Sequence, residues 1–186
     1  MGRGPGTGGL PVEAFVALVE QEGAAIHAYL ARRAPRAAED LLARVWLEAF
    51  AARTTYDPEL GAPRVWLFGV ARHVLHRHWR DLARQPHERG SATDPDLVED
   101  PWDEVDRRLD AAELAGPLRD ALDDLPAVDR EMLLLVAWEQ LTPTEAAAVV
   151  GIPPATARTR LHRARARMRC ALDDCDRPVP LSGGPR

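Results

Sequence analysis

The chain has 186 residues, 46% of them hydrophobic, and a formal net charge of -5 at pH 7. This length allows one domain or two small ones, and the acidic balance argues against a protein that coats nucleic acid with its whole surface. No segment approaches the roughly twenty apolar residues needed to span a bilayer. Residues 1–11 lack the apolar core of a secretion signal, so we expect a disordered tail there and a cytoplasmic location.

Residues 12–82 are expected to form a first helical block. Apolar residues at helical spacing predict a helix from about Phe15 to Leu30, a second at Ala37–Ala51 and a third at Arg64–Arg80. Thr54–Pro63 contains Asp-Pro and Gly, which mark a loop between the second and third helices. No sustained alternating strand pattern occurs, and the sequence therefore predicts an all-α fold.

Residues 83–108 differ in composition from the blocks on either side. Pro86, Gly90, Pro95 and Pro101 lie among many acids, and no apolar periodicity persists. Such a segment cannot bury enough apolar surface to order itself, so we predict a flexible acidic linker. Trp102 is the exception and could dock on a neighbouring surface.

A second helical block is predicted for residues 109–173, followed by a disordered tail at residues 174–186. Its first helix passes through Leu118 and Leu122, and its second covers Pro126–Trp138. Two further helices follow, joined by a tight turn at Gly151. The tail after residue 173 is rich in Pro and Gly, which disfavour regular structure.

The last two predicted helices have the pattern of a helix-turn-helix. Thr142 and Glu145 are spaced for a capping box, and Pro154 suits the start of the second helix. That helix places four residues at spacings of three and four on one apolar stripe, namely Ala157, Leu161, Ala164 and Met168. Arginines occupy its other faces, and residues 153–168 contain no acid. A small basic helix with an apolar back is what the DNA major groove accepts.

We assign candidate DNA contacts within this last helix by side-chain chemistry. Arg158, Thr159 and His162 are candidates for base edges, because arginine can bond guanine bidentately. Phosphate contacts position a helix without reading sequence. The full candidate set for this helix is Thr156, Arg158, Thr159, Arg160, His162, Arg163 and Arg165, with Arg160, Arg163 and Arg165 as the phosphate contacts.

Three segments in this order resemble the extracytoplasmic-function sigma factors of the sigma-70 family. Ala38–Phe50 resembles the family's core-polymerase-binding helix, and Trp66–Arg80 resembles its promoter minus-ten helix. Leu122–Glu131 and the following helix-turn-helix resemble its region 4, which reads the minus-thirty-five element. The chain departs from the common pattern at His73 and Arg77, where the family often has Asn and an acid, so its minus-ten preference is expected to differ. In region 4 it has Thr159 where the family often has Ser, which is a mild change.

The resemblance implies two small helical domains, region 2 and region 4, joined by the acidic linker. It implies that the protein binds core RNA polymerase, directs it to specific promoters and promotes DNA opening, without catalysis of its own and without a cofactor. Expected partners are the polymerase (its beta-prime coiled coil and beta flap), promoter DNA and an anti-sigma factor. No small-molecule substrate is expected, and the free protein is expected to be a monomer.

The resemblance also implies two sets of contact residues in the first block. Loop Thr54–Pro63 is placed to form a pocket for an unstacked base, on which Tyr56 could stack. The minus-ten candidates are Tyr56, Arg72, His73, His76, Arg77 and Arg80. The core-polymerase candidates are Asp40, Leu41, Arg44, Val45 and Glu48, although Leu41 and Val45 could instead be core residues.

Other functions fit the sequence less well. A helix-turn-helix regulator acting without polymerase would leave Ala38–Phe50 and Trp66–Arg80 as packing only, and a protein-binding helical adaptor would leave the arginine helix unexplained. No metal site is expected from His73, His76 and His78, because His78 falls on a different helix face. Cys170 and Cys175 are expected to be reduced thiols rather than a redox switch.

Overall fold

The computed structural model describes residues 9–84 and 115–175 of the chain. Every regular element within these ranges is a helix, which confirms the all-α expectation. The first range contains α1 (Val12–Arg33), α2 (Ala38–Ala52), the short 3-10 helices η1 (Arg53–Thr55) and η2 (Pro58–Leu60), and α3 (Pro63–Arg84). The second contains α5 (Ala115–Asp123), α6 (Ala127–Ala137), α7 (Pro143–Val150) and α8 (Pro154–Cys175).

The helix positions agree with the sequence periodicity to within a few residues at most ends. Helix α3 continues to Arg84 rather than ending near Arg80, and α8 continues to Cys175, into the first residues of the predicted tail. Most of the predicted linker, including Trp102, lies outside the described residues, as do most of the two predicted tails. None of the helices in the described ranges is long and apolar enough to cross a membrane.

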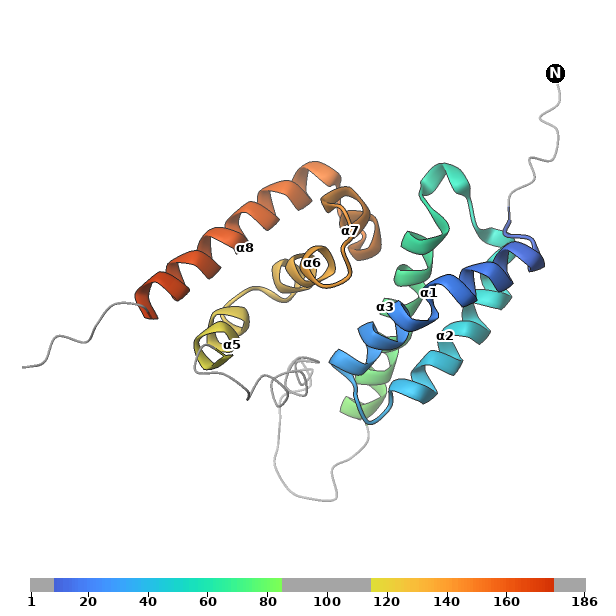
Figure 1. The fold of residues 1–186 in the computed structure, drawn as a ribbon, viewed down its shortest axis with the longest axis horizontal. Helices are drawn as coiled ribbons and strands as arrows, with labels where there is room; N and C mark the ends of the chain where they lie inside the picture. Colours follow the sequence, from blue (N-terminus) through green and yellow to red (C-terminus); the bar gives the residue numbers. More distant parts are fainter. Residues whose placement is uncertain (1–8, 85–114, 176–186) are drawn as a thin grey trace, which may run out of the picture.

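Helices α1, α2 and α3 pack around a core in the first half of the chain (Figure 1). Ile26 and Leu30 of α1, Val45 of α2 and Phe68 of α3 are fully buried there. Tyr29 and Phe68 meet edge to face, with ring centroids 5.6 Å apart. This arrangement fixes α3 along one side of the bundle, preceded by the loop that contains η1 and η2 (Figure 1).

In the second half, α8 runs along one side and packs against α5, α6 and α7 (Figure 1). Ala164 and Met168 of α8 share a small core with Leu122 and Leu134. Arg130 of α6 caps the C-terminal end of α5, because its guanidinium donates to the carbonyls of Leu122 (2.7 Å) and Asp123 (2.8 Å). These carbonyls have no partner within their own helix, so Arg130 ties α5 to α6.

The two halves are packed against each other, a feature that the sequence did not predict. Helix α7 lies against α3, with α6 beside it (Figure 1). Met132 and Leu135 of α6 are fully buried and belong to the same apolar cluster as the core of the first half. The two predicted helical units therefore share one continuous core in this structure.

Candidate nucleic-acid interface

Helices α7 and α8 form a helix-turn-helix whose local chemistry matches the sequence prediction. The Thr142 hydroxyl accepts from the Glu145 backbone N–H at 3.2 Å, and the Glu145 carboxylate accepts from the Thr142 backbone N–H at 2.7 Å, which completes the capping box. The Thr142 hydroxyl also donates to the Glu145 carboxylate at 2.7 Å, and this bond, followed by the one from the Thr142 backbone N–H, holds the pKa of Glu145 below its usual value. Gly151 ends α7 in the left-handed region at φ 82°, where a side chain would be strained.

Helix α8 buries the predicted apolar stripe and exposes most of the predicted DNA contacts. Ala157, Leu161, Ala164 and Met168 are all buried. The predicted DNA contacts that are exposed to solvent are Thr156, Arg158, Thr159, His162, Arg163 and Arg165. The buried stripe holds the helix in place, and the exposed arginines remain available to phosphates and base edges.

Two members of the predicted set have partners within the protein: the Thr159 hydroxyl donates to the Ala155 carbonyl at 3.2 Å, and Arg160 forms an ion pair. Its guanidinium lies 2.8 Å from the carboxylate of Asp129, which is buried at the start of α6. Arg160 therefore links α8 to α6 through this ion pair. The sequence predicted instead that its guanidinium is available for a DNA phosphate. A buried carboxylate needs a cation as its partner. The sequence did not indicate this pair, because Asp129 and Arg160 are far apart in the chain.

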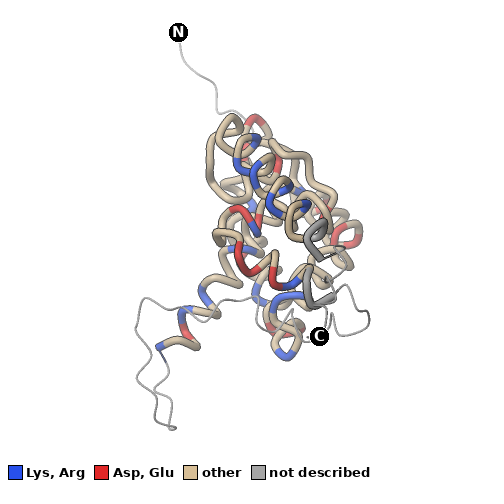
Figure 2. The backbone as a smooth tube through the Cα atoms, turned by 90° about the vertical axis from the view of Figure 1, so that its left-hand side faces the viewer, with Lys and Arg blue, Asp and Glu red and all other residues tan. Residues whose placement is uncertain are grey.

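The second basic element is α3. From Arg72 onward it carries four arginines and a single acid, Asp81, and its last turns project from the body of the molecule (Figure 2). His73, Arg77 and Arg80 are exposed. The Arg77 guanidinium lies 2.9 Å from the carboxylate of Glu48 on α2.

Arg72 and His76, the other two minus-ten candidates on α3, face the second half of the chain. Nε of Arg72 lies 3.0 Å from the Glu131 carboxylate of α6, and Nε2 of His76 lies 3.9 Å from the same oxygen. Burial, and the neighbouring Arg72 after it, lower the pKa of His76 from its usual value. In this structure Glu131 of α6 thus pairs with Arg72, while His76, whose side chain is 44% exposed, lies beside that pair.

The loop before α3 borders a pocket, as the sequence led us to expect. The pocket has a volume of about 480 Å³ and is lined by Glu48 and Ala52 of α2, by residues of the loop and of α3, and by Ala148 of α7. Tyr56, Trp66 and His73 are among its walls. Its size and its aromatic lining fit an unstacked base.

Tyr56 contributes to this pocket differently from the prediction. Its ring is buried, its hydroxyl donates to the Gly61 carbonyl at 2.8 Å, and it meets Trp66 edge to face at 5.7 Å. Trp66, which the sequence analysis placed in the apolar stripe, is only half-buried and lines the pocket. The position of Trp66 close after the loop was the signal in the sequence that could have indicated its place in the pocket wall.

The predicted core-polymerase residues of α2 separate into two groups. Leu41 and Val45 are 1% and 0% exposed and belong to the core, so they present no surface to a partner here. Asp40 and Arg44 are exposed, and Glu48 is half-exposed. Two apolar residues of the same helix that the sequence did not single out, Leu47 and Phe50, are 71% and 43% exposed. Phe50 packs edge to face on Phe15, with ring centroids 5.5 Å apart, and Leu47 is the more exposed of the two.

The second half also contains an apolar groove between α5, α6 and α8, with a volume of about 720 Å³. Its lining includes Leu118, Leu122, Leu133 and Trp138. Arginines and a histidine of α8 lie along one edge, namely Arg158, His162, Arg165 and Arg169. No group of His, Cys, Asp and Glu suited to a metal ion occurs among the described residues, and Cys170 is exposed on α8.

Comparison with known proteins identifies the family. Residues 18–85 match the family Sigma-70 region 2, and residues 115–168 match Sigma-70, region 4. The chain is also 32% identical over 157 residues to the ECF RNA polymerase sigma factor SigC of Mycobacterium tuberculosis, covering 84% of this chain and 80% of that relative. The chain is an extracytoplasmic-function sigma factor of the sigma-70 family. It directs RNA polymerase to promoters.

Two solved structures have the same fold as this sigma factor. One is the sigma factor RpoE in complex with the anti-sigma factor NepR from Bartonella quintana, at a TM-score of 0.60 and 22% identity over 89% of this chain and all of that one (100%). The other is CnrH in complex with the cytosolic domain of CnrY, at a TM-score of 0.58 and 26% identity, over 90% of this chain and 92% of that one. The residues matched to region 2 thus lie in α1, α2, α3 and the loop between α2 and α3, and those matched to region 4 lie in α5–α8.

Proposed function

We propose that this sigma factor uses region 2 to open and hold the minus-ten element and region 4 to read the minus-thirty-five element as duplex DNA. The observation that carries the proposal is the presence of two different nucleic-acid surfaces on one chain. One is the exposed arginine face of α8, and the other is the pocket of about 480 Å³ beside basic helix α3. A helix for duplex DNA and a pocket for an unpaired base are both needed when a promoter is found and then opened.

In region 2, we propose that the base enters the pocket against Trp66, with His73 at its edge. Tyr56 supports Trp66 and does not itself stack on the base, because its ring is buried and its hydroxyl is bonded to Gly61. Arg77 and Arg80 meet the backbone of the opened strand along the projecting end of α3 (Figure 2).

In region 4, Arg158, Thr159 and His162 read base edges, and Arg163 and Arg165 hold phosphates. Thr156 lies at the exposed start of α8, beside the base-reading residues. Arg160 instead holds the helix in position through Asp129. The protein itself performs no covalent chemistry in this proposal, and it works in the cytoplasm with the polymerase.

For the polymerase contacts, we propose the exposed face of α2 and the groove of region 4. On α2, the exposed charged residues Asp40 and Arg44 and the exposed apolar residues Leu47 and Phe50 suit the beta-prime coiled coil. Glu48 is partly available beside them. The apolar groove between α5, α6 and α8 suits an apolar segment of the beta flap. An anti-sigma factor, as in the complexes of RpoE with NepR and of CnrH with CnrY, is a further proposed partner.

The decisive experiment is transcription with purified sigma factor and bacterial core polymerase on a genomic promoter library. Start sites that share a bipartite motif and depend on the sigma factor would support the proposal. DNA binding without initiation would contradict it and favour a regulator that acts without polymerase. The sigma factor must be purified free of any anti-sigma partner.

The role of the pocket is tested by His73→Ala, since His73 is exposed and its removal leaves the core intact. We expect weak initiation on duplex promoters and recovery on templates that are already opened over the minus-ten element. His27→Ala on α1 removes a histidine away from both DNA surfaces and serves as the control. Equal defects of His73→Ala on both templates would contradict a role in opening.

A further inference from the structure

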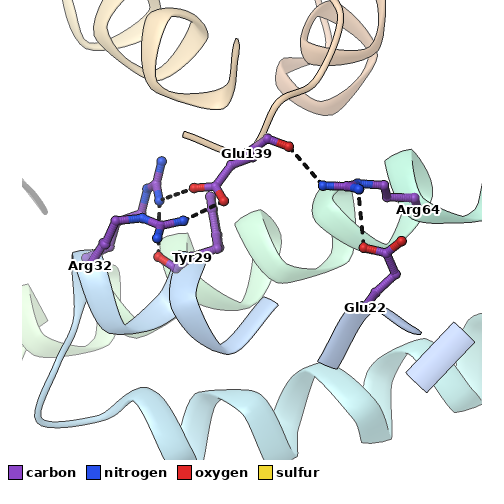
Figure 3. A network of polar contacts seen from close by, with 6 residues as sticks. Glu22, Tyr29, Arg32, Arg64 and Glu139 are labelled. Carbon is purple, nitrogen blue, oxygen red and sulfur yellow. Dashed lines mark hydrogen bonds and ion pairs between the residues drawn. The ribbon is translucent and has the colours of Figure 1, made fainter. Parts of the chain in front are cut away.

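Ion pairs between acids and arginines occur both inside this protein and on the surface proposed for the minus-ten element. Glu139 belongs to the first kind, because it is 3% exposed and its two carboxylate oxygens accept from Arg32 and Arg33 of α1 (Figure 3). Glu48 of α2 belongs to the second kind. Its side chain is 32% exposed and lies in the wall of the pocket proposed for the unstacked base. An acid in this position can meet a ligand.

The carboxylate of Glu48 is held from one side. Its oxygen Oε2 accepts from the Arg77 guanidinium at 2.9 Å, whereas Oε1 makes no hydrogen bond within the described part of the chain. Glu48 and Ala52, one helical turn apart, are the α2 residues in the pocket wall, and His73, one turn before Arg77, lines the pocket from α3. Arg77 thus fixes one oxygen of Glu48 and leaves the other able to accept from a base.

The other oxygen-bearing side chains of the pocket wall also offer acceptors. The hydroxyl protons of Thr55 and Tyr56 are already donated to backbone carbonyls, at 2.7 and 2.8 Å. Asp57 is a second carboxylate, and one of its oxygens accepts from a backbone N–H of the loop at 2.9 Å. The side chains of the wall that can donate are His73 and Trp66. Acceptors therefore outnumber donors around the pocket.

The four bases differ in how well they match such a wall. Adenine, cytosine and guanine each carry an exocyclic amino group, which donates, and carboxylates accept from such groups in protein–DNA complexes. Thymine has no amino group, and its one ring N–H lies between two carbonyl oxygens that a carboxylate repels. A wall that contains Glu48 therefore favours a base with an amino group and disfavours thymine.

We propose that Glu48 selects the unstacked base of the minus-ten element by accepting from its exocyclic amino group, and that Arg77 is the positioning residue that holds Glu48 beside the pocket. The inference rests on the proposed function of this pocket and adds which base class it takes. A guanidinium has five N–H donors, so Arg77 can hold Glu48 and still contact a phosphate of the opened strand.

The selection is measured with the complex of sigma factor and core polymerase, by sequencing the strands that it retains from a pool of random single-stranded DNA. We expect one position at which an amino-bearing base exceeds thymine about tenfold, the effect of one hydrogen bond to a charged group. Glu48→Gln keeps the side-chain length and supplies an amide that can donate to thymine, so the preference at this position should disappear. Glu39→Gln makes the same change on the same helix, at an exposed pair with His27, and should leave the preference intact.

Three results would contradict the proposal. Absence of such a position, or a preference that Glu48→Gln leaves unchanged, would overturn it. Loss of the preference in Asp57→Asn but not in Glu48→Gln would assign the selection to Asp57 and overturn it as well. Arg77→Ala should weaken retention of all strands and also lower the base preference, and weaker retention with an intact preference would overturn the positioning role of Arg77.

A second measurement needs no substitution in the protein. In a retained strand, the selected base is replaced by its analogue without the amino group, which is purine for adenine, 2-pyrimidinone for cytosine and hypoxanthine for guanine. Affinity should fall about tenfold for the parent complex and stay the same for Glu48→Gln. Equal affinity of the parent for both strands would overturn the proposal. Neither measurement requires initiation, so failure here is distinguishable from failure of the proposed function in transcription.

Discussion

The ion pair between Arg160 and Asp129 allows a quantitative test of how the recognition helix is positioned. The two charged groups are 2.8 Å apart, with Asp129 side-chain exposure at 8% and that of Arg160 at 39%. Exposed pairs contribute up to about 1 kcal/mol, and hydrogen bonds to charged groups contribute about 1.5–3 kcal/mol. Because one partner is buried and the other is partly screened by solvent, we expect a coupling of about 1–2 kcal/mol.

The coupling is measured by a double-mutant cycle of Asp129→Ala and Arg160→Ala in urea denaturation. Each single substitution should lower the free energy of unfolding, and the double variant should lose less than the sum of the two. Additive losses would refute the assignment of Arg160 to Asp129.

Binding to a minus-thirty-five duplex at several salt concentrations separates this role from a phosphate contact. If Arg160 mainly positions α8, Arg160→Ala weakens binding but leaves the slope of log affinity against log salt nearly unchanged. Loss of one phosphate contact would lower the magnitude of that slope by about 0.9. A change of that size would show that Arg160 leaves Asp129 to bind DNA.

Three further substitutions test local features of region 4. Gln140 has φ 55° in the turn after α6, and Gln140→Gly should raise the free energy of unfolding by about 1 kcal/mol in thermal denaturation, because glycine adopts this conformation without strain. The hydrogen bonds from Thr142 that lower the pKa of Glu145 stabilise the fold above the ordinary carboxyl pKa of 4.5, and this contribution should be lost as the pH falls through the lowered value. Glu145→Gln should remove that part of the pH dependence, measured by denaturation across the acid range; an unchanged profile would contradict it. Arg158→Ala should relax sequence preference by about 1–3 kcal/mol, whereas Arg163→Ala should weaken binding to specific and random duplexes alike. Equal losses for both arginine variants in competition binding would contradict the assignment of their roles.

The features of region 4 that the sequence predicted well are local ones. The Thr142–Glu145 capping box and the turn at Gly151 each depend on residues within one or two helical turns. The buried stripe of α8 follows from helical spacing alone. All of these were confirmed.

Features that depend on distant residues were not predictable in the same way. Arg32 and Glu139 are separated by 107 positions, and Arg72 and Glu131 by 59. No periodicity connects such pairs, so a sequence shows the charges but not their partners. Helical spacing likewise placed Leu41 and Val45 on one face of α2 without indicating whether that face meets a partner or the protein's own core.

The apolar cluster shared by the two regions has a consequence for how the molecule unfolds. Tyr29 and Phe68 of region 2 belong to the same buried cluster as Met132 and Leu135 of region 4. Two domains joined only by a linker would melt in separate transitions, whereas units that bury each other's side chains lose their structure together. Calorimetry of the free chain should therefore record a single cooperative transition, and region 2 expressed alone should melt at a lower temperature than it does in the whole protein.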